Sequence, residues 1–573
     1  MLLKMLSWPA LLTLWQCAAA GASAPERILV PGPEDIPEWV QQGNLRFTRL
    51  DGGPIEVLKT SRSLWGSHFT EAQKEVLANL YTKYGDRTLA LLEQAHINAV
   101  WLTWSVGYSW NDEAEQREQC KRFVARLHER GIRAAAYACS VSVFWESLFR
   151  DEPRSVRWLV FDPKGVPYRY SGGRDPLRFI ADISNPEWVE LVKRRVGAAI
   201  DAGFDALFFD NTASAAFSDA AAMDAFMGKI RRYIHQEKHS NLLLFTNYGL
   251  APTRAPLNHN MDFVFAESWR EPGVWGSDWD ASNIRRTKYL RGIIPEWKPL
   301  TTEYSIFHAG DRASTFLAPR SQKLATAEAA TFQSDYSWDM EGPFDGALLT
   351  NDPAAMASWK AIGEYSLFLR QHADLYRKAH SVSPIAVILP ATGVSFGWDR
   401  EKSGLLDELS RHSVLYDIRL ASLLDRDQLR RYQAVVVPPG LEITQALREY
   451  QDQGGKVYTA ARADQSTIAE IRALSPGAPS LAIEGAPYVL GNITRPGSGK
   501  SLAIHLLNYA PDPLAGVQVR VDLGKQFSSL IGNPQVFTPD RAVTLAKVNR
   551  KGTALEFTLD RLDTYAVVVL HFQ

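Results

Sequence analysis

The chain has 573 residues, of which 46% are hydrophobic and 11% aromatic. A single hydrophobic core stops growing at roughly 250–300 residues, so this length predicts two to four domains, and the composition excludes a disordered chain. Lys and Arg (63) nearly balance Asp and Glu (64), which gives no strong field for nucleic acid or an anionic membrane surface. A neutral or weakly charged partner fits better.

Residues 1–24 have the features of a secretory signal peptide. They contain one Lys, an apolar stretch too short to span a bilayer, and small residues that end in Ala22-Ser23-Ala24. A proline directly after Ala24 makes cleavage after Ala20 an equal alternative. A lipid anchor on Cys17 is the less favoured reading, because the three residues before it form a poor lipobox. We therefore expect a secreted or periplasmic protein with no membrane span.

Residues 25–80 are interpreted as an N-terminal extension, after which short apolar runs alternate with amphipathic stretches. Eight strands are expected, at residues 99–105, 132–139, 179–182, 206–210, 242–247, 263–267, 300–304 and 336–340. The clearest helix lies between the third and fourth, with Asn185 as N-cap, Pro186 at the first helical position and Gly203 beyond its end. This alternation predicts a (β/α)8 barrel over residues 81–382.

Two further domains are expected after the barrel. The strand-like runs IAVILP, YQAVVVPPG and KVYTAA, with helical stretches between them, predict a flavodoxin-like or amidotransferase-like α/β domain over residues 383–474. From residue 475 to 573, SLAIHLLNY, VQVRVDL, ALEFTLD and YAVVVLHF alternate with turn residues and predict an antiparallel β-sandwich. The expected fold class is therefore α/β, with a sandwich at the C-terminus.

Polar and aromatic side chains recur where the expected barrel strands end. Because every strand of such a barrel points its carboxyl end at one face, which carries the active site, these side chains should share a pocket. They are Trp104, Tyr108, Asp182, Asp210, Asn211, Asn247, Tyr248, Glu267, Trp269, Glu303, Tyr304, Asp335, Asp339 and Glu341.

This set is rich in carboxylates, Trp and Tyr and poor in His. Two carboxyl groups cleave a glycosidic bond, one protonating the leaving oxygen while the other attacks the anomeric carbon or activates water, with neither metal nor cofactor. Flat aromatic faces stack on sugar rings, and Asn and Asp bind their hydroxyl groups. The strand ends therefore predict a site for an oligo- or polysaccharide, with no metal and no cofactor.

A resemblance to known enzymes agrees with this chemistry. The segments RFIADISNPEWVELV, AGFDALFFDN and FVFAESW resemble those of secreted bacterial glycoside hydrolases related to the α-galactosidase and α-amylase superfamilies. The middle segment, with VVVPPG and DQGGKVY, resembles the β-galactosidase trimerisation domain, which implies a possible homo-oligomer. The last segment, with IHLLNY, resembles the C-terminal β-sandwich of such enzymes.

The resemblance also implies catalytic roles. In α-galactosidase-like barrels the nucleophile is an Asp that ends the fourth strand, here Asp210, and the acid is a carboxyl group on the sixth strand, here Glu267. The chain departs from that pattern, because the sixth-strand residue is Glu rather than Asp, and Glu303 on the seventh strand competes for the role of acid/base. The expected function is a retaining glycoside hydrolase.

Each candidate also has a structural interpretation. Asp210 and Asp182 could cap the helices that follow them, and Glu267 could pair with an arginine of the barrel. Trp104, Tyr108 and Trp269 could belong to the core at the barrel rim. The other expected substrate contacts are Asn211, Asn247, Tyr248, Glu303 and Tyr304. An alternative function is a non-catalytic carbohydrate-binding protein of the cell envelope on the same scaffold.

Overall fold

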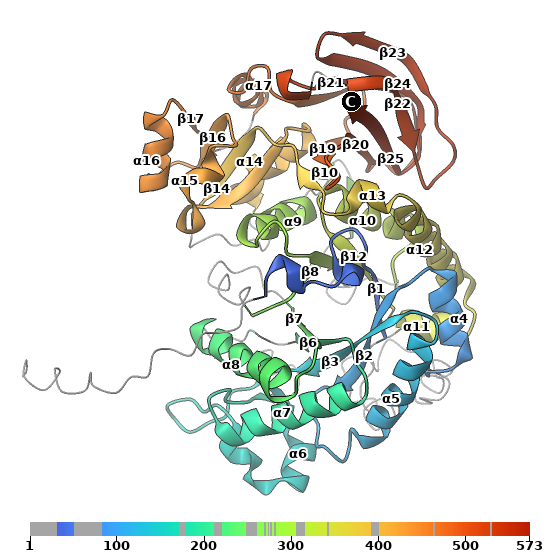
Figure 1. The fold of residues 1–573 in the computed structure, drawn as a ribbon, viewed down its shortest axis with the longest axis vertical. Helices are drawn as coiled ribbons and strands as arrows, with labels where there is room; N and C mark the ends of the chain where they lie inside the picture. Colours follow the sequence, from blue (N-terminus) through green and yellow to red (C-terminus); the bar gives the residue numbers. More distant parts are fainter. Residues whose placement is uncertain are drawn as a thin grey trace, which may run out of the picture.

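The computed structural model describes residues 31–50, 83–170, 178–210, 212, 220–247, 260–268, 271–272, 274–275, 278–279, 282–304, 316–340, 343–390, 400–461, 464–527 and 530–572. A barrel occupies the first two thirds of the chain, and the middle and C-terminal domains lie next to each other against one side of it (Figure 1). Among the described residues, no helix has the length and apolarity that a membrane span requires.

Eight parallel strands form the barrel sheet: β1 (Arg46–Leu50), β2 (Ala99–Ser105), β3 (Arg133–Cys139), β6 (Ala206–Asp210), β7 (Leu243–Thr246), β8 (Val264–Ser268), β11 (Leu300–Tyr304) and β12 (Asp335–Asp339). Their order is β7-β6-β3-β2-β1-β12-β11-β8. A parallel bridge between Asn247 and Phe265 brings the two ends of this sheet together. The predicted (β/α)8 barrel is confirmed.

Helices surround the sheet (Figure 1): α4 (Asp86–Gln94), α5 (Ala114–His128), α7 (Pro186–Asp201), α8 (Ala220–Arg232), α9 (Ser282–Ile293), α10 (Pro319–Thr331), α11 (Pro343–Leu349) and α12 (Pro353–Gln371). Helix α7 begins as its sequence predicts, since the Asn185 side chain accepts hydrogen bonds from the backbone N–H groups of Glu187 and Trp188. The short helix α13 (Ala373–Tyr376) leads out of the barrel.

Two expectations about the barrel strands are wrong. Strand β1 lies in the segment 25–80, so this segment is more than an extension, and the barrel begins before residue 81. Its five residues carry a weak apolar signal, and only pairing with β2 and β12 defines its place. Residues 179–182 are not a barrel strand, because β5 (Arg178–Ile180) pairs antiparallel with β4 (Ser142–Phe144) outside the barrel sheet.

The two errors offset each other from β6 onward, so Asp210 ends the fourth barrel strand and Glu267 lies on the sixth. Successive side chains of a strand point to opposite faces. Leu102 and Leu207 consequently pack outward against the helices, while aromatic rings fill the barrel interior. We call this inner layer the aromatic floor: Phe47, Trp101, Tyr137, Phe208, Phe245 and Phe265.

The middle domain contains the parallel strands β14 (Ile385–Leu389), β15 (Tyr416–Leu420), β16 (Ala434–Val437) and β17 (Lys456–Thr459). Helices α14 (Arg400–Arg411), α15 (Arg426–Leu429), α16 (Gln445–Asp452) and α17 (Gln465–Ala473) connect or follow them. The sheet order β15-β14-β16-β17 is that of a flavodoxin-like fold and confirms the prediction.

This domain packs closely on barrel helix α9. Arg285 donates two hydrogen bonds to Asp407, at 2.6 and 2.8 Å, and Lys288 Nζ lies 2.5 Å from the Tyr416 carbonyl oxygen. At Gly292 the backbones meet so closely that an added Cβ would lie 2.2 Å from the Ile418 carbonyl oxygen. A glycine is therefore required at this point of α9.

The C-terminal domain is the predicted sandwich of two antiparallel sheets. One contains β13 (His380–Ser381), β19 (Val489–Arg495), β20 (Ser501–Asn508), β25 (Tyr565–Phe572) and β22 (Leu530–Phe537). The other contains β18 (Ser480–Glu484), β21 (Leu514–Asp522), β24 (Ala554–Leu562) and β23 (Leu545–Lys551). All eight residues of β20 are buried, because the second sheet covers one face of this strand and barrel helices cover the other.

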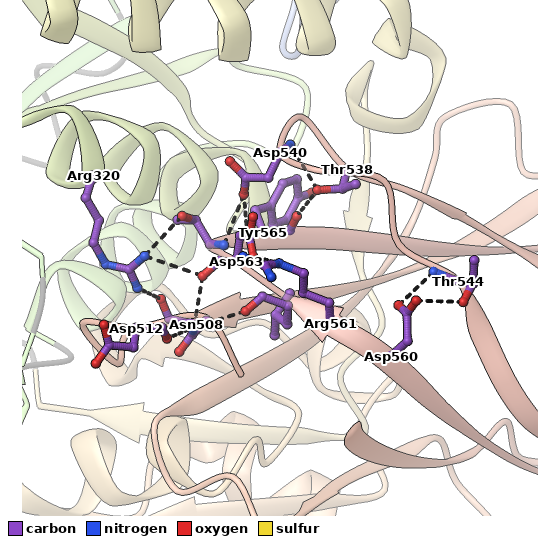
Figure 2. A network of polar contacts seen from close by, with 12 residues as sticks. Arg320, Asn508, Asp512, Thr538, Asp540, Thr544, Asp560, Arg561, Asp563 and Tyr565 are labelled. Atoms are coloured by element: carbon purple, nitrogen blue, oxygen red, sulfur yellow. Dashed lines mark hydrogen bonds and ion pairs between the residues drawn. The ribbon is translucent and has the colours of Figure 1, made fainter. Parts of the chain in front are cut away.

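Polar contacts complete the junction between barrel and sandwich, as Figure 2 shows around Arg320 and Asp540. Arg320 of α10 donates to the Asn508 carbonyl oxygen at 3.0 Å. The Asp540 carboxylate accepts a hydrogen bond from the Tyr365 hydroxyl at 2.9 Å and lies 3.2 Å from Lys323 Nζ. The sandwich is thus fixed to α10 and α12 by apolar and polar contacts together.

We expect Gly292→Ala to lower the free energy of unfolding by about 1–3 kcal/mol, because the new methyl group has no space against β15. Gly404→Ala is the matched control in helix α14, where an added Cβ meets nothing within 4 Å, and it should raise stability by about 0.5–1 kcal/mol. Urea denaturation of both variants tests this. Equal stability of the two would contradict the close packing on α9.

Candidate active site

The carboxyl ends of the barrel strands carry a ring of polar side chains directly above the aromatic floor. Asp210 follows Phe208 by two residues and Glu267 follows Phe265 by two, so each carboxyl group points into the barrel on the same face as the ring below it. The same alternation applies on the other strands. The inward groups at this level are Arg49, Asp210, Asn247, Glu267, Glu303 and Asp339.

Arg49 lies among three of the carboxyl groups. Its Nη1 is 2.5 Å from Glu303 Oε1 and 3.3 Å from Glu267 Oε1, and its Nε is 3.4 Å from Asp339 Oδ1. The guanidinium carbon lies 5.0 Å from the centroid of the Trp101 ring in the aromatic floor. Arg49 thus contacts three carboxyl groups at different distances, and its shortest contact is with Glu303.

Glu303 and Glu267 differ in their access to solvent. The Glu303 side chain is completely buried and accepts a hydrogen bond from Ser337 Oγ at 3.0 Å, whereas the Glu267 side chain is 17% exposed. Burial raises the pKa of Glu303 well above its usual value, against the opposing effect of Arg49. Burial also raises the pKa of Glu267, Arg49 opposes this, and the charge of Asp210 adds to it. Of the two, only Glu267 is open to a substrate.

Asp210 is half-buried and is held by neutral hydrogen-bond donors. Its Oδ2 accepts from the Tyr137 hydroxyl at 2.7 Å, and its Oδ1 accepts from Asn247 Nδ2 at 3.2 Å. The Asn247 side chain also lies close enough to Glu267 to lower the pKa of this carboxyl group. Asn247 therefore links the two carboxyl groups that the sequence selects as catalytic.

The backbone of this strand end is fixed as well. The Asp210 carbonyl oxygen accepts hydrogen bonds from the backbone N–H and the Oγ of Ser140, at 3.0 and 2.9 Å. Thr246 Oγ1 donates to the Phe209 carbonyl oxygen at 2.7 Å, and Thr212 Oγ1 donates to the Asn247 carbonyl oxygen at 3.0 Å. The strands that carry Asp210 and Asn247 are thus held in register at their ends.

The segment that contains β4 and β5 adds two further side chains, Tyr170 and Arg178. Arg178 Nη2 lies 2.9 Å from Ser142 Oγ and 3.8 Å from Cys139 Sγ, and its guanidinium carbon lies 4.3 Å from the Tyr170 ring centroid. Burial raises the pKa of Tyr170, and the charge of Asp210 raises it further. Tyr170 and Arg178 therefore belong to the surroundings of Asp210.

The structure brings Asp210, Asn247, Glu267 and Glu303 together, as expected from the sequence. The expected sugar contact at Trp104 is wrong, because this side chain points outward and is only 3% exposed. Its Nε1 donates to the Arg195 carbonyl oxygen at 3.0 Å and its ring packs edge-on against Phe204. A register irregularity between Thr103 and Ser105 marks this end of β2.

Three other candidates lie apart from this group or contact other elements. Asp182 Oδ1 accepts hydrogen bonds from the backbone and side chain of Ser184, in the turn that leads into α7. Asp335 lies at the opposite end of β12 and accepts from the Gly43 backbone N–H at 3.0 Å. The Tyr108 backbone N–H donates to Glu113 at 3.1 Å, which fixes the loop after β2.

Four candidates, Asn211, Tyr248, Trp269 and Glu341, lie outside the described residues, as does the side chain of Tyr304. Their roles stay predictions. The sequence interpretation missed Arg49, Tyr137 and Tyr170. Arg49 and Tyr137 could have been found, because each alternates with apolar neighbours of a short strand and precedes its carboxyl end by one or two residues.

Within the described part of the chain, no group of three or more His, Cys, Asp and Glu side chains is placed to hold a metal ion. Among the described residues of the barrel mouth, Glu267, Glu303 and Asp339 contact the guanidinium of Arg49.

No protein-family model matches the sequence, and a search of curated proteins finds no significant match. Solved structures are similar over most of the chain. α-L-Fucosidase isoenzyme 2 from Paenibacillus thiaminolyticus has a TM-score of 0.68 at 13% identity, covering 92% of this chain and 99% of that chain. The debranching enzyme from Nostoc punctiforme has a TM-score of 0.49 at 12% identity, covering 94% and 99%. At 13% identity the first likeness establishes the fold alone.

We expect Arg49→Met to lower the free energy of unfolding by about 3–5 kcal/mol at pH 7.5, because buried carboxylates lose their cation. The pKa values of Glu303 and Glu267 are raised in the folded state, so the ionisation of these groups destabilises the protein as pH rises. The loss of stability caused by the substitution should therefore be smaller at pH 5 than at pH 7.5. Urea denaturation at both pH values measures it. Arg133→Met is the control, because the Arg133 side chain is 48% exposed in its ion pair with Asp205, and it should change stability by less than about 1 kcal/mol. An equal loss of stability in Arg49→Met at both pH values would contradict this expectation.

Proposed function

We propose that this protein is a glycoside hydrolase that cleaves O-glycosidic bonds with net retention, with Asp210 as nucleophile and Glu267 as acid/base. The observation that carries the proposal is the pair of carboxyl groups linked through Asn247 at one barrel face. Their surroundings differ, and two carboxyl groups in unequal surroundings are what acid and nucleophile roles require. The enzyme-like fold of the compared fucosidase supports a carbohydrate substrate.

The reaction follows from these assignments. Glu267, whose pKa is raised by burial, donates its proton to the glycosidic oxygen. The bond from this oxygen to the anomeric carbon breaks while a carboxylate oxygen of Asp210 bonds to the same carbon and forms a glycosyl ester. Glu267, now ionised, then removes a proton from water. The water oxygen attacks the anomeric carbon, and Asp210 leaves as a carboxylate.

The donors around Asp210 support its role as nucleophile. Hydrogen bonds donated to a carboxylate stabilise its charged form, and Asp210 accepts one on each oxygen. Tyr137 is only 8% exposed, and its ring belongs to the aromatic floor. These two donors hold the carboxylate in one orientation.

The contact of Asn247 with both carboxyl groups supports retention. Retaining enzymes place their two carboxyl groups about 5–5.5 Å apart, and inverting enzymes place them about 6.5–9.5 Å apart to admit a water molecule. Two acceptors that share one side-chain amide fit the shorter separation.

Glu267 is favoured over Glu303 as acid/base. A general acid must touch the leaving oxygen, and the completely buried Glu303 is enclosed by Arg49 and Ser337. We assign Glu303 the task of holding Arg49 in place. Secretion of the enzyme is supported by the signal-like residues 1–24, and the substrate is proposed to be an oligo- or polysaccharide.

We expect Asp210→Asn to lose at least about 10³-fold in kcat on any aryl glycoside that the wild type cleaves, with unchanged thermal stability. The measurement is a panel of 4-nitrophenyl glycosides, with proton NMR of the first product to read the anomeric configuration. Turnover near the wild-type level would remove Asp210 from the mechanism. Sugar binding without turnover by the wild type would instead support the non-catalytic carbohydrate-binding alternative.

We expect Glu267→Gln to slow methyl or oligosaccharide substrates by about 10²–10⁴-fold, because their leaving oxygen needs a proton. Glycosyl-ester formation from 2,4-dinitrophenyl glycosides should change little, since this leaving group departs unprotonated. The wild-type rate should fall as pH rises through the raised pKa of Glu267, and this fall should be absent in the variant. Glu303→Gln is the control. If it, and not Glu267→Gln, shows this pattern, the acid is Glu303.

A further inference from the structure

The two oxygens of the Asp210 carboxylate are held differently. Oδ2 accepts a hydrogen bond from the Tyr137 hydroxyl at 2.7 Å, whereas Oδ1 accepts one from Asn247 Nδ2 at 3.2 Å. The first distance is typical of a hydroxyl group that donates to a charged carboxylate, and the second is at the long limit for an N–H donor. The carboxylate is therefore held firmly at Oδ2 and loosely at Oδ1.

The two oxygens also face different parts of the barrel. Strand β6, which ends at Asp210, lies between β3 and β7 in the sheet, and Tyr137 belongs to β3. Asn247 directly follows β7 and forms a bridge with Phe265 of β8. Since β8 also carries Glu267, Oδ1 faces the side of the proposed acid/base, and Oδ2 faces the opposite side.

The Tyr137 hydroxyl is fixed by the packing of its ring. The ring centroid lies 5.5 Å from that of Trp101 and 5.6 Å from that of Phe208, both in the aromatic floor. A ring that is held by close neighbours has little freedom to follow a moving partner. The hydrogen bond from Tyr137 therefore restrains Oδ2 more than the amide of Asn247 restrains Oδ1.

We propose that Asp210 attacks the anomeric carbon with Oδ1, and that Tyr137 is a positioning residue that holds Oδ2 and stabilises the carboxylate when the sugar is released. The inference rests on the proposed function, because it assigns the two oxygens of the proposed nucleophile. It adds that one hydroxyl group affects the two steps of the reaction unequally.

The unequal effect follows from the charge on Asp210. In the first step Oδ1 bonds to the anomeric carbon while the bond from this carbon to the leaving oxygen breaks, and Oδ2 becomes the carbonyl oxygen of the ester. In the second step a water oxygen bonds to the anomeric carbon, and the electron pair of the bond to Oδ1 returns to the carboxylate. A hydrogen bond to a charged carboxylate is stronger than one to an ester carbonyl. Tyr137 therefore favours the second step.

The variant Tyr137→Phe tests this role, since it keeps the packed ring and removes only the hydroxyl group. The matched control is Tyr365→Phe, which removes a comparable hydrogen bond to Asp540, 2.9 Å long, between α12 and the sandwich. Both variants and the wild type are assayed by stopped flow on a 2,4-dinitrophenyl glycoside that the wild type cleaves. Thermal melting verifies that each protein is folded.

We expect hydrolysis of the glycosyl ester to slow about 10–100-fold in Tyr137→Phe, because a hydrogen bond to a charged group is lost. The values of kcat and KM should fall together, so that kcat/KM changes less than about threefold, and a burst of dinitrophenolate should precede the steady state. Tyr365→Phe should match the wild type. An unchanged rate of ester hydrolysis, or a fall in kcat/KM as large as that in kcat, would overturn the role of Tyr137.

A crystal structure of the wild type with a 2-deoxy-2-fluoro sugar trapped on the enzyme tests the assignment of the oxygens directly. The sugar should be bonded to the oxygen near Asn247, with the ester carbonyl oxygen accepting from Tyr137. A sugar bonded to the oxygen that Tyr137 contacts would overturn the proposal. Peptide mass spectrometry of the same adduct reports on the proposed function separately. A label on a residue other than Asp210 removes both proposals, whereas a label on Asp210 with unchanged kinetics in Tyr137→Phe removes only the role of Tyr137.

Discussion

The site depends on one buried guanidinium group. Four carboxyl groups point into one end of the barrel above a layer of aromatic rings, where their charges would repel each other and lack water. Arg49 compensates three of them unequally, with Glu303 nearest. Arg49 pairs with the buried Glu303, whereas Glu267 is partly exposed and has a pKa that burial raises. A single cation in a low-dielectric setting thereby distinguishes groups of identical chemistry.

The opposite side of the mouth is built differently. Asp210 is oriented by the neutral donors Tyr137 and Asn247 and lies beside Tyr170 of the β3–α7 segment. Asn247 joins the two sides, since it contacts both Asp210 and Glu267. Arg49 contacts the carboxyl groups on one side, whereas Asp210 on the other side accepts hydrogen bonds from Tyr137 and Asn247 and lies in the field of Arg178. This difference in surroundings supports the proposed acid and nucleophile.

The middle domain and the sandwich pack behind the side of the barrel mouth that carries Arg49. Helix α9 follows β8, which carries Glu267, and packs against the middle domain, while α10 joins β11 to β12 and packs against the sandwich (Figure 1). The strands of Glu267, Glu303 and Asp339 are thus braced from outside. The β3–α7 segment lies on the other half of the barrel, where five of its large apolar side chains are exposed.

The sequence by itself indicated the fold class and the position of Asp210 and Glu267 at the carboxyl ends of barrel strands, because period-two alternation and the ends of apolar strands are local signals. It misplaced β1 and residues 179–182, since whether a short apolar run joins the barrel depends on which distant strand it pairs with. Trp104 lies on the outward face of β2 with Leu102, as the alternation along the strand requires, and is therefore part of the core. Only the tertiary structure decided the unequal sharing of Arg49, because burial and charge depend on residues more than 200 positions apart.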